Sequence, residues 1–139
     1  MSTGQVLLTL AAIVLLSYIS LNIQQMYVQS VGSTVDSQYT SDALNFGRDI
    51  SERVQSFAFK YDQLMNEFGG LNDVTDPDSR IEFTSQVGES FFATVDISDE
   101  GELIHNQNGR TATIRVYIYN DSSDQYQLQA EYVTAITEL

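Results

Sequence analysis

The sequence predicts an α+β protein: a long hydrophobic N-terminal helix, then a small body of one helix packed on an antiparallel, meander-like or sandwich-like sheet. Three observations support this fold class. Residues 1–35 contain no Asp, Glu, Lys, Arg or His. Residues 42–68 carry apolar side chains at helical spacing, and residues 81–136 alternate apolar and polar side chains as strands do. We therefore expect a hydrophobic helical domain at 1–35 and an acidic α+β body at 36–139.

Charge is confined to the second of these domains. The chain has 139 residues and a net charge of −13, from 6 Lys/Arg and 19 Asp/Glu. So acidic a body repels phosphate, and we expect no direct binding of nucleic acid. Because the chain has no cysteine, disulfide frameworks and cysteine-based zinc sites are excluded. A hydrophobic content of 42% argues against wholesale disorder.

The uncharged segment predicts one helix from about Gln5 to Val31, apolar all round at first and amphipathic later. Residues 6–23 read VLLTLAAIVLLSYISLNI, and 14 of these 18 are apolar. At about 1.5 Å per residue they span roughly 27 Å, close to the ~30 Å hydrocarbon core of a bilayer. Gly32-Ser33-Thr34 predicts an end or a bend of this helix, and residues 33–41 form a polar, turn-prone stretch.

Three interpretations of this helix are open. A secretory signal would need a basic start and a small-residue cleavage site, and neither is present. A single-pass anchor usually has flanking Lys or Arg, but the first basic residue is Arg48. The third interpretation is a helix that leaves the membrane and packs among identical copies. Ala11, Ala12 and Ser17, placed among larger apolar residues, favour such close helix packing.

The stretch from Gly4 to Ala11, GQVLLTLA, with its short polar start and the amphipathic continuation before a β-rich body, resembles the type IV pilin superfamily of bacterial and archaeal filament subunits. The likeness covers about the first 30 residues. It leaves open whether Met1 begins the mature chain or Gly4 ends a short leader. Many members place a glutamate early in the mature helix. The matching position here is Gln5 or Thr9, and neither side chain ionises.

The resemblance implies a structural subunit of an extracellular pilus-like filament on the cell surface. The subunit would sit in the membrane before assembly and then form a homopolymer through its N-terminal helices. The expected assembly interface comprises Val6, Leu7, Leu8, Leu10, Ala11, Ala12, Ile13, Val14, Leu15, Leu16, Ile19 and Ile23. The alternative is a single-pass, membrane-anchored extracytoplasmic binding module.

The body begins with a predicted helix over 42–68. Ser41 followed by Asp42 is typical of a helix start, and Gly69-Gly70 of a helix end. Between them one apolar stripe recurs at spacings of three and four residues, which favours a helix packed on a sheet. The stripe comprises Ile50, Val54, Phe57, Tyr61, Leu64 and Phe68.

The rest of the body predicts a meander of four antiparallel strands with short turns. Period-2 alternation indicates strands over 81–87, 91–97, 110–119 and 126–132, with a shorter run at 102–106. Asn108-Gly109 is a strong signal for a two-residue hairpin turn that leads into 110–119.

Residues typical of catalysis are few, and we expect neither an enzyme nor a bound cofactor. His105 is the only histidine, and no GxSxG or phosphate-binding glycine motif is present. Asp73, Asp76 and Asp78 share one loop and are candidate Ca²⁺ ligands. The alternative is that they are solvated turn residues of an acidic protein, which would have the same sequence pattern. Asn120-Asp121-Ser122 is a sequon, so Asn120 is a candidate glycosylation site.

Overall fold

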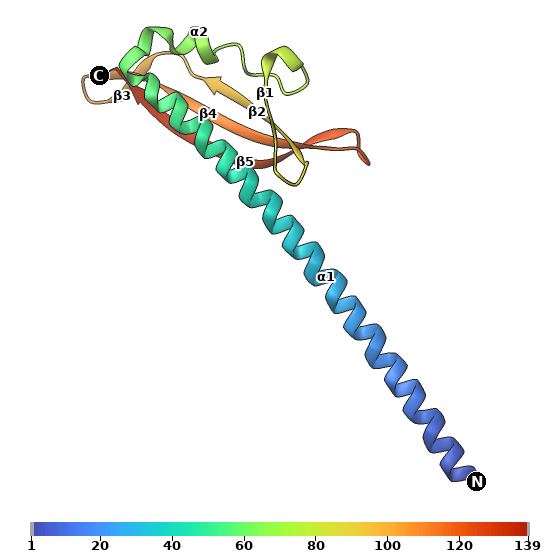
Figure 1. The fold of residues 1–139 in the computed structure, drawn as a ribbon. Coiled ribbons are helices and arrows are strands. Elements are labelled where there is room, and N and C mark those ends of the chain that lie inside the picture. The colour runs from blue at the N-terminus through green and yellow to red at the C-terminus, as the bar shows by residue number, and fades with distance from the viewer. Residues whose placement is uncertain (1, 139) are drawn as a thin grey trace. The chain divides into compact units, whose positions relative to one another are not determined.

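The computed structural model describes residues 2–138 and has the predicted α+β fold, with one long N-terminal helix and an antiparallel sheet (Figure 1). In chain order the elements are helix α1 (Thr3–Ser56), the 3-10 helix η1 (Phe57–Gln63), helix α2 (Leu64–Phe68), the 3-10 helix η2 (Pro77–Ser79), and strands β1 (Ile81–Thr84), β2 (Ser90–Ile97), β3 (Gly101–Ile104), β4 (Gln107–Asn120) and β5 (Gln125–Thr137).

Helix α1 is continuous, so the helix does not end at residues 32–34, and the stretch 33–41, predicted to be turn-prone, is helical. Its residues are polar but include no proline, and one glycine inside a helix costs only about 1 kcal/mol. The hydroxyl of Thr34 donates to the carbonyl oxygen of Ser30 at 2.9 Å, which satisfies a polar side chain within the helix. At the start of the helix, the Ser2 hydroxyl accepts the backbone N–H of Gln5 at 3.3 Å.

The helix predicted over 42–68 is therefore the end of α1 followed by η1 and α2. Lys60 has φ −133° and ψ 47°, which interrupts the regular helical geometry inside η1. The chain divides into two compact units between Gln38 and Tyr39, three residues beyond the boundary expected from charge.

The sheet is arranged around β4, with every strand pair antiparallel. Strand β2 pairs with residues 112–118 of β4, and β3 pairs with 107–109. Strand β5 pairs with 109–120 and so occupies the other edge of β4. The four predicted strands therefore pair in chain order as a meander, β1–β2–β4–β5, and the short β3 pairs with the start of β4.

The hairpin between β3 and β4 turns at residues 105–106, where Asn106 has φ 63°, and not at Asn108-Gly109 as predicted. Gly109 lies within β4, paired with Gly101 on one side and Thr137 on the other. A Cβ atom there would collide with the carbonyl oxygen of Ile136. Glycine at 109 therefore allows close approach of strands and does not form the turn.

The first strand is also shorter than predicted, because Val87 lies in the turn after β1 and is exposed.

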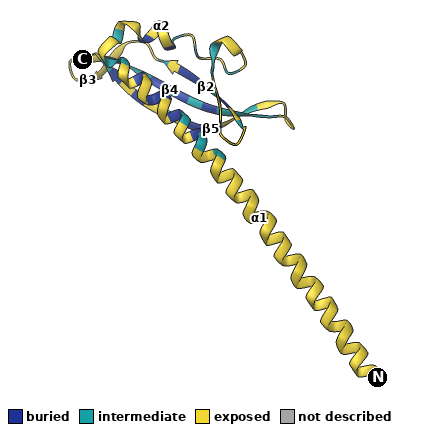
Figure 2. Ribbon diagram, viewed as in Figure 1, coloured by how far each residue is buried: buried dark blue, intermediate teal, exposed yellow. Residues whose placement is uncertain are grey.

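The second unit contains the hydrophobic core (Figure 2). Ile50, Val54, Leu64 and Phe68 of the predicted apolar stripe are buried, and Phe57 and Tyr61 are half-buried against them. This confirms that the stripe packs on the sheet, where it meets the inward-facing side chains of β2 and β4: Phe91, Ala93, Val95, Ala112, Ile114 and Val116.

Helix α1 approaches the sheet closely at Gly47. A Cβ at this position would lie 2.8 Å from the ring of Tyr132 and 3.2 Å from a methyl group of Val116. The Tyr132 hydroxyl donates to the backbone carbonyl of Leu44 at 3.0 Å, which ties the same turn of α1 to β5. Gln55 Nε2 of α1 also donates to the Thr134 hydroxyl of β5 at 2.7 Å, so hydrophobic packing and hydrogen bonds together fix the last third of α1 on the sheet.

On the opposite face of the sheet, Arg80 organises a small polar–aromatic cluster. Its Nη1 donates to the Tyr126 hydroxyl at 2.6 Å and to the Val74 carbonyl at 2.8 Å, and its Nη2 lies 2.7 Å from the Glu82 carboxylate. The guanidinium carbon lies 4.3 Å from the centroid of the Phe92 ring. Burial alone would lower the pKa of Arg80, but its hydrogen bonds to Glu82 and Tyr126 outweigh burial and raise it.

Candidate functional site

All twelve side chains predicted to form the assembly interface lie on the first unit and are exposed (Figure 2). Every residue from 2 to 38 is exposed, including Leu8 at 73% and Val14 at 68% of their full areas. The helical run Thr3–Phe68 contains an 18-residue window of mean hydropathy 2.3, none of it buried. This helix is long and apolar enough to cross a membrane.

The hydroxyl groups within this apolar segment are satisfied by the helix itself. Thr9 donates to the carbonyl of Gln5 and Ser17 to the carbonyl of Ile13, both at 2.8 Å. Such bonds remove the cost of placing a hydroxyl in an apolar environment. The segment from Val6 to Ile19 can therefore face hydrocarbon or other helices without leaving a hydroxyl group of Thr9 or Ser17 unpaired.

Two shallow grooves run along the surface of this helix. The first, called here the apolar groove, is lined by Leu7, Leu10, Ala11, Val14, Leu15 and Tyr18. The second, called the amide groove, is lined by Leu21, Gln24, Gln25, Val28 and Gln29. The apolar groove brings together five of the twelve predicted interface residues. The sequence pattern i, i+3, i+4, i+7, i+8 could have revealed both grooves.

Two of the three aspartates predicted as candidate calcium ligands, Asp73 and Asp76, form hydrogen bonds within their own loop through their carboxylates. Asp73 Oδ1 accepts the backbone N–H of Thr75 at 2.9 Å and its hydroxyl at 2.6 Å. These hydrogen bonds lower the pKa of Asp73. Asp76 accepts the backbone N–H of Asp78 at 3.1 Å and caps η2. Among residues 2–138, no three His, Asp or Glu side chains gather in an arrangement that could hold a metal ion.

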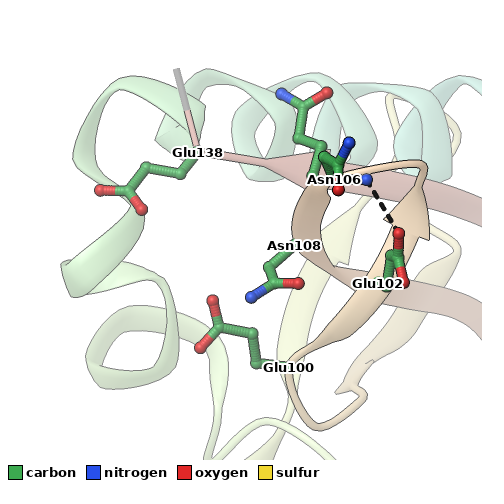
Figure 3. Close-up of a pocket in the computed structure, with 6 residues that line it drawn as sticks. Glu100, Glu102, Asn106, Asn108 and Glu138 are labelled. Carbon is green, nitrogen blue, oxygen red and sulfur yellow. Dashed lines mark hydrogen bonds between the residues drawn. The ribbon is translucent and has the colours of Figure 1, made fainter.

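A second acidic feature was not predicted as a site. Glu100, Glu102 and Glu138 line an open pocket together with the amides of Asn106 and Asn108 (Figure 3). The carboxylate of Glu102 accepts the backbone N–H of Asn106 at 2.8 Å. The sequence alone does not place Glu138 here, because it is the pairing of β4 with β5 that brings the C-terminal end of the chain to this turn.

The remaining two candidates lie at turns. His105 is 91% exposed, and its Nδ1 lies 3.9 Å from the Glu102 carboxylate, so it occupies the surface position expected of a non-catalytic histidine. Asn120 ends β4, and its side-chain oxygen accepts the backbone N–H of Ser122 at 2.9 Å. Glycosylation of Asn120 stays a prediction.

Comparison with known proteins identified no match: no protein-family model, no curated protein and no solved structure is similar to this chain.

Proposed function

We propose that the protein is a non-enzymatic structural subunit of an extracellular, pilus-like helical filament that polymerises through its N-terminal helix. The observation that carries the proposal is an apolar, uncharged helical segment in which every described residue is exposed, joined in sequence to a body with its own core. Full burial of one Leu, Ile or Val side chain is worth about 1.5–3 kcal/mol, so more than ten exposed side chains of this kind require cover.

Lipid and neighbouring helices can each provide that cover. Before assembly, the segment spans the membrane and its side chains contact lipid. During assembly, lipid contacts are exchanged for helix–helix packing, which small residues such as Ala11 and Ala12 favour. The charges, which begin at Asp36, stay outside the packed apolar segment. Repetition of one head-to-tail contact then gives an open helical polymer.

The proposed function involves no catalysis and no cofactor. His105 is exposed, with its Nδ1 3.9 Å from the Glu102 carboxylate, and the carboxylates of Asp73 and Asp76 accept hydrogen bonds from their own loop. The acidic surface also favours a partner other than nucleic acid. What the filament surface binds is left open by the proposal.

Deletion of residues 1–31 tests the proposal against the alternative of a membrane-anchored binding module. The fragment 32–139 retains the whole hydrophobic core, so we expect a soluble monomer that sediments as a single species at every concentration. The full chain, freed from detergent, should form large assemblies. If the full-length protein remained a monomer or a small oligomer without detergent, the proposal that it is a filament subunit would be wrong. Regular polymers made by the fragment would show that the helix is not the assembly element.

A further inference from the structure

The sheet of the second unit has two free edges. Its strands pair in the order β1–β2–β4–β5, so β1 and β5 each pair with a single strand. Among residues 2–138, no further strand pairs with either of them. Strand β5 has 13 residues and contains neither Lys nor Pro, the residues that commonly protect an edge. A sheet edge of this kind is a place where a strand of another chain can be added.

Both edge strands are locally neutral, although the body as a whole is strongly acidic. Strand β1 carries one charged residue, Glu82, and its carboxylate lies 2.7 Å from Nη2 of Arg80. Strand β5 also carries one, Glu131, and its carboxylate lies 3.0 Å from Nε of Arg115. Because an arginine offsets the negative charge on each edge strand, the repulsion between two acidic bodies is reduced at these edges.

We propose that the β5 edge of one copy of the chain receives the β1 edge of the next copy as an added antiparallel strand. The register places Phe83 opposite Tyr132 and Thr84 opposite Glu131. This inference rests on the proposed function, because a four-residue strand pair is short and holds only bodies that the filament already brings close together. It adds a contact between bodies, separate from the packing of the N-terminal helices.

The strand directions make this contact a repeating one. Strand β1 runs antiparallel to β2, β2 to β4, and β4 to β5, so β1 and β5 run in opposite directions. When two copies lie side by side in the same orientation, β1 of one therefore meets β5 of the other antiparallel, and both sheets turn the same face to the same side. The contact joins two different edges, so it leaves a free edge at each end and continues from copy to copy.

The faces of the side chains restrict the register. Side chains directly opposite each other in an antiparallel pair lie on the same face of the sheet. Phe83 faces α1, because its ring stacks on that of Phe46 with the centroids 5.0 Å apart. Tyr132 faces α1 as well, since its hydroxyl donates to the carbonyl of Leu44. Phe83 is 42% exposed at the edge of the sheet, and pairing with Tyr132 of another copy would cover it with a second aromatic ring.

The neighbouring registers that keep the faces matched are less favourable. Moving β1 by two residues toward the start of β5 would place Glu82 opposite Glu131, and like charges directly opposite each other destabilise a strand pair. This move would also bring β1 onto the register shift at Gln129, where the regular ladder is interrupted. Moving β1 the other way would bring it to the end of β5 near η1, whose Tyr61 interacts with Glu138.

A second β5 edge is a less favourable occupant of the β5 edge. Full overlap of two antiparallel β5 strands would place their central residues opposite each other, and the central residue is Glu131. Such a pair would also close as a two-fold dimer, which cannot repeat along a filament. In the proposed register, Glu131 lies opposite the uncharged Thr84 instead.

Disulfide cross-linking tests this contact, because the chain has no cysteine of its own. The variant Thr84→Cys, Glu131→Cys places one thiol on each edge, at two exposed positions. Within one copy these thiols cannot join, since β2 and β4 separate the two edge strands by about 14 Å and the Cα atoms of a disulfide lie within about 7 Å. The matched control, Thr84→Cys, Gln125→Cys, moves the second thiol about 20 Å along β5 to another exposed position.

Full-length filaments of each variant, and of each single-cysteine variant, are assembled without detergent and confirmed by electron microscopy. They are then oxidised mildly and analysed on non-reducing gels and by peptide mass spectrometry. We expect Thr84→Cys, Glu131→Cys to give a ladder of dimers, trimers and longer covalent chains, joined between positions 84 and 131. The matched control and the single-cysteine variants should stay monomeric on the gel.

Intact filaments of Thr84→Cys, Glu131→Cys that give no ladder would overturn the inference and leave the proposed function standing. An equal ladder from the matched control would overturn the register and with it the inference. Dimers formed by Glu131→Cys alone would show a two-fold contact between β5 edges and would overturn it too. Failure of the wild type to form filaments would instead overturn the proposed function, on which the inference rests.

Discussion

At the residue scale, the body depends on polar side chains whose position in the sequence does not reveal their role. Arg80 precedes β1 and is spaced like any exposed turn residue, yet its side chain is only 10% exposed. It joins the Val74 loop, β1 and β5 through one guanidinium group. Arg115, by contrast, forms a single ion pair with Glu131 at 3.0 Å, and both side chains are more than a third exposed.

Substitution of Arg80 should therefore cost far more stability than substitution of Arg115. We expect Arg80→Ala to lower the free energy of unfolding by about 2–3 kcal/mol, because charge-assisted hydrogen bonds and a cation–π contact are lost together. Arg115→Ala should cost at most about 1 kcal/mol, as exposed ion pairs do. Urea unfolding of the fragment 32–139 measures the change in the free energy of unfolding for each substitution. Equal changes for Arg80→Ala and Arg115→Ala would contradict the prediction.

Tyr61 gives a second prediction at this scale. Its hydroxyl oxygen is buried and has no hydrogen-bond partner among the described residues. Burial raises the pKa of Tyr61, and the nearby Glu100 carboxylate adds to this, while Arg110 opposes it in part. A raised pKa in the folded state stabilises the fold below the pKa of the unfolded chain, near 10, and that contribution is lost as pH rises through the folded value.

Tyr61→Phe should thus leave stability at neutral pH unchanged or raise it by up to about 1 kcal/mol, since an unpaired buried hydroxyl is removed. It should also weaken the fall in stability above pH 10. Urea unfolding of fragment 32–139 at neutral and alkaline pH tests both effects, with Tyr117→Phe as the control. A clear loss of stability at neutral pH would mean that the hydroxyl has a partner in solution.

At the element scale, the continuity of α1 is the largest difference between the sequence prediction and the structure. The sequence did predict the apolar helix, the stripe Ile50–Phe68, and the strands β2, β4 and β5, because burial on one face imposes a period on each. The segment 33–41 has no such period. Its helical state follows from helix on both sides, since propagation costs far less than nucleation.

The errors within the sheet have a similar cause. Asn108-Gly109 is a strong local turn signal, but the close approach of β3 and β5 to Gly109 requires the glycine inside a strand. The pairing of Gly109 with β3 and β5 depends on contacts between strands that are distant in sequence, and local propensity does not include such contacts. The acidic pocket was missed for the same reason, because Glu138 is distant in sequence from Glu100 and Glu102.

Hydrogen exchange tests the continuity of α1 directly. The amides of 33–41 should exchange more slowly than those of Asp99 and Glu100, which connect β2 to β3 in the same molecule, because helical amides are hydrogen-bonded to the preceding turn. Mass spectrometry of the full chain in detergent, followed by proteolysis, reports both segments at once. Equal rates in the two segments would show that residues 33–41 form a linker.

At the scale of the whole molecule, charge and hydropathy change close to the boundary between the two units. Most of the large exposed apolar residues lie between positions 6 and 35, and all 25 charged residues lie at position 36 or later. Such a distribution suits a subunit whose first part is removed from water and whose second part stays in it. The excess of 19 acidic over 6 basic residues also makes the body repel itself.

Stability of the body should therefore depend on salt. Lowering the ionic strength from about 1 M to about 10 mM lengthens the screening distance roughly tenfold. We expect the melting temperature of fragment 32–139 to fall by about 5 °C over this range. The variant Glu100→Gln, Glu102→Gln, Glu138→Gln removes the charge of the acidic pocket and should reduce the fall. Melting temperatures independent of salt would contradict the role assigned to self-repulsion.

The most direct test of the central claim is negative-stain electron microscopy of the full-length protein isolated from its source, with detergent removed. We predict thin fibres of uniform width, built by packing of the exposed Val6–Ile23 segment. Single particles that need detergent at every concentration, with no fibres, would contradict the claim and identify the helix as a membrane anchor.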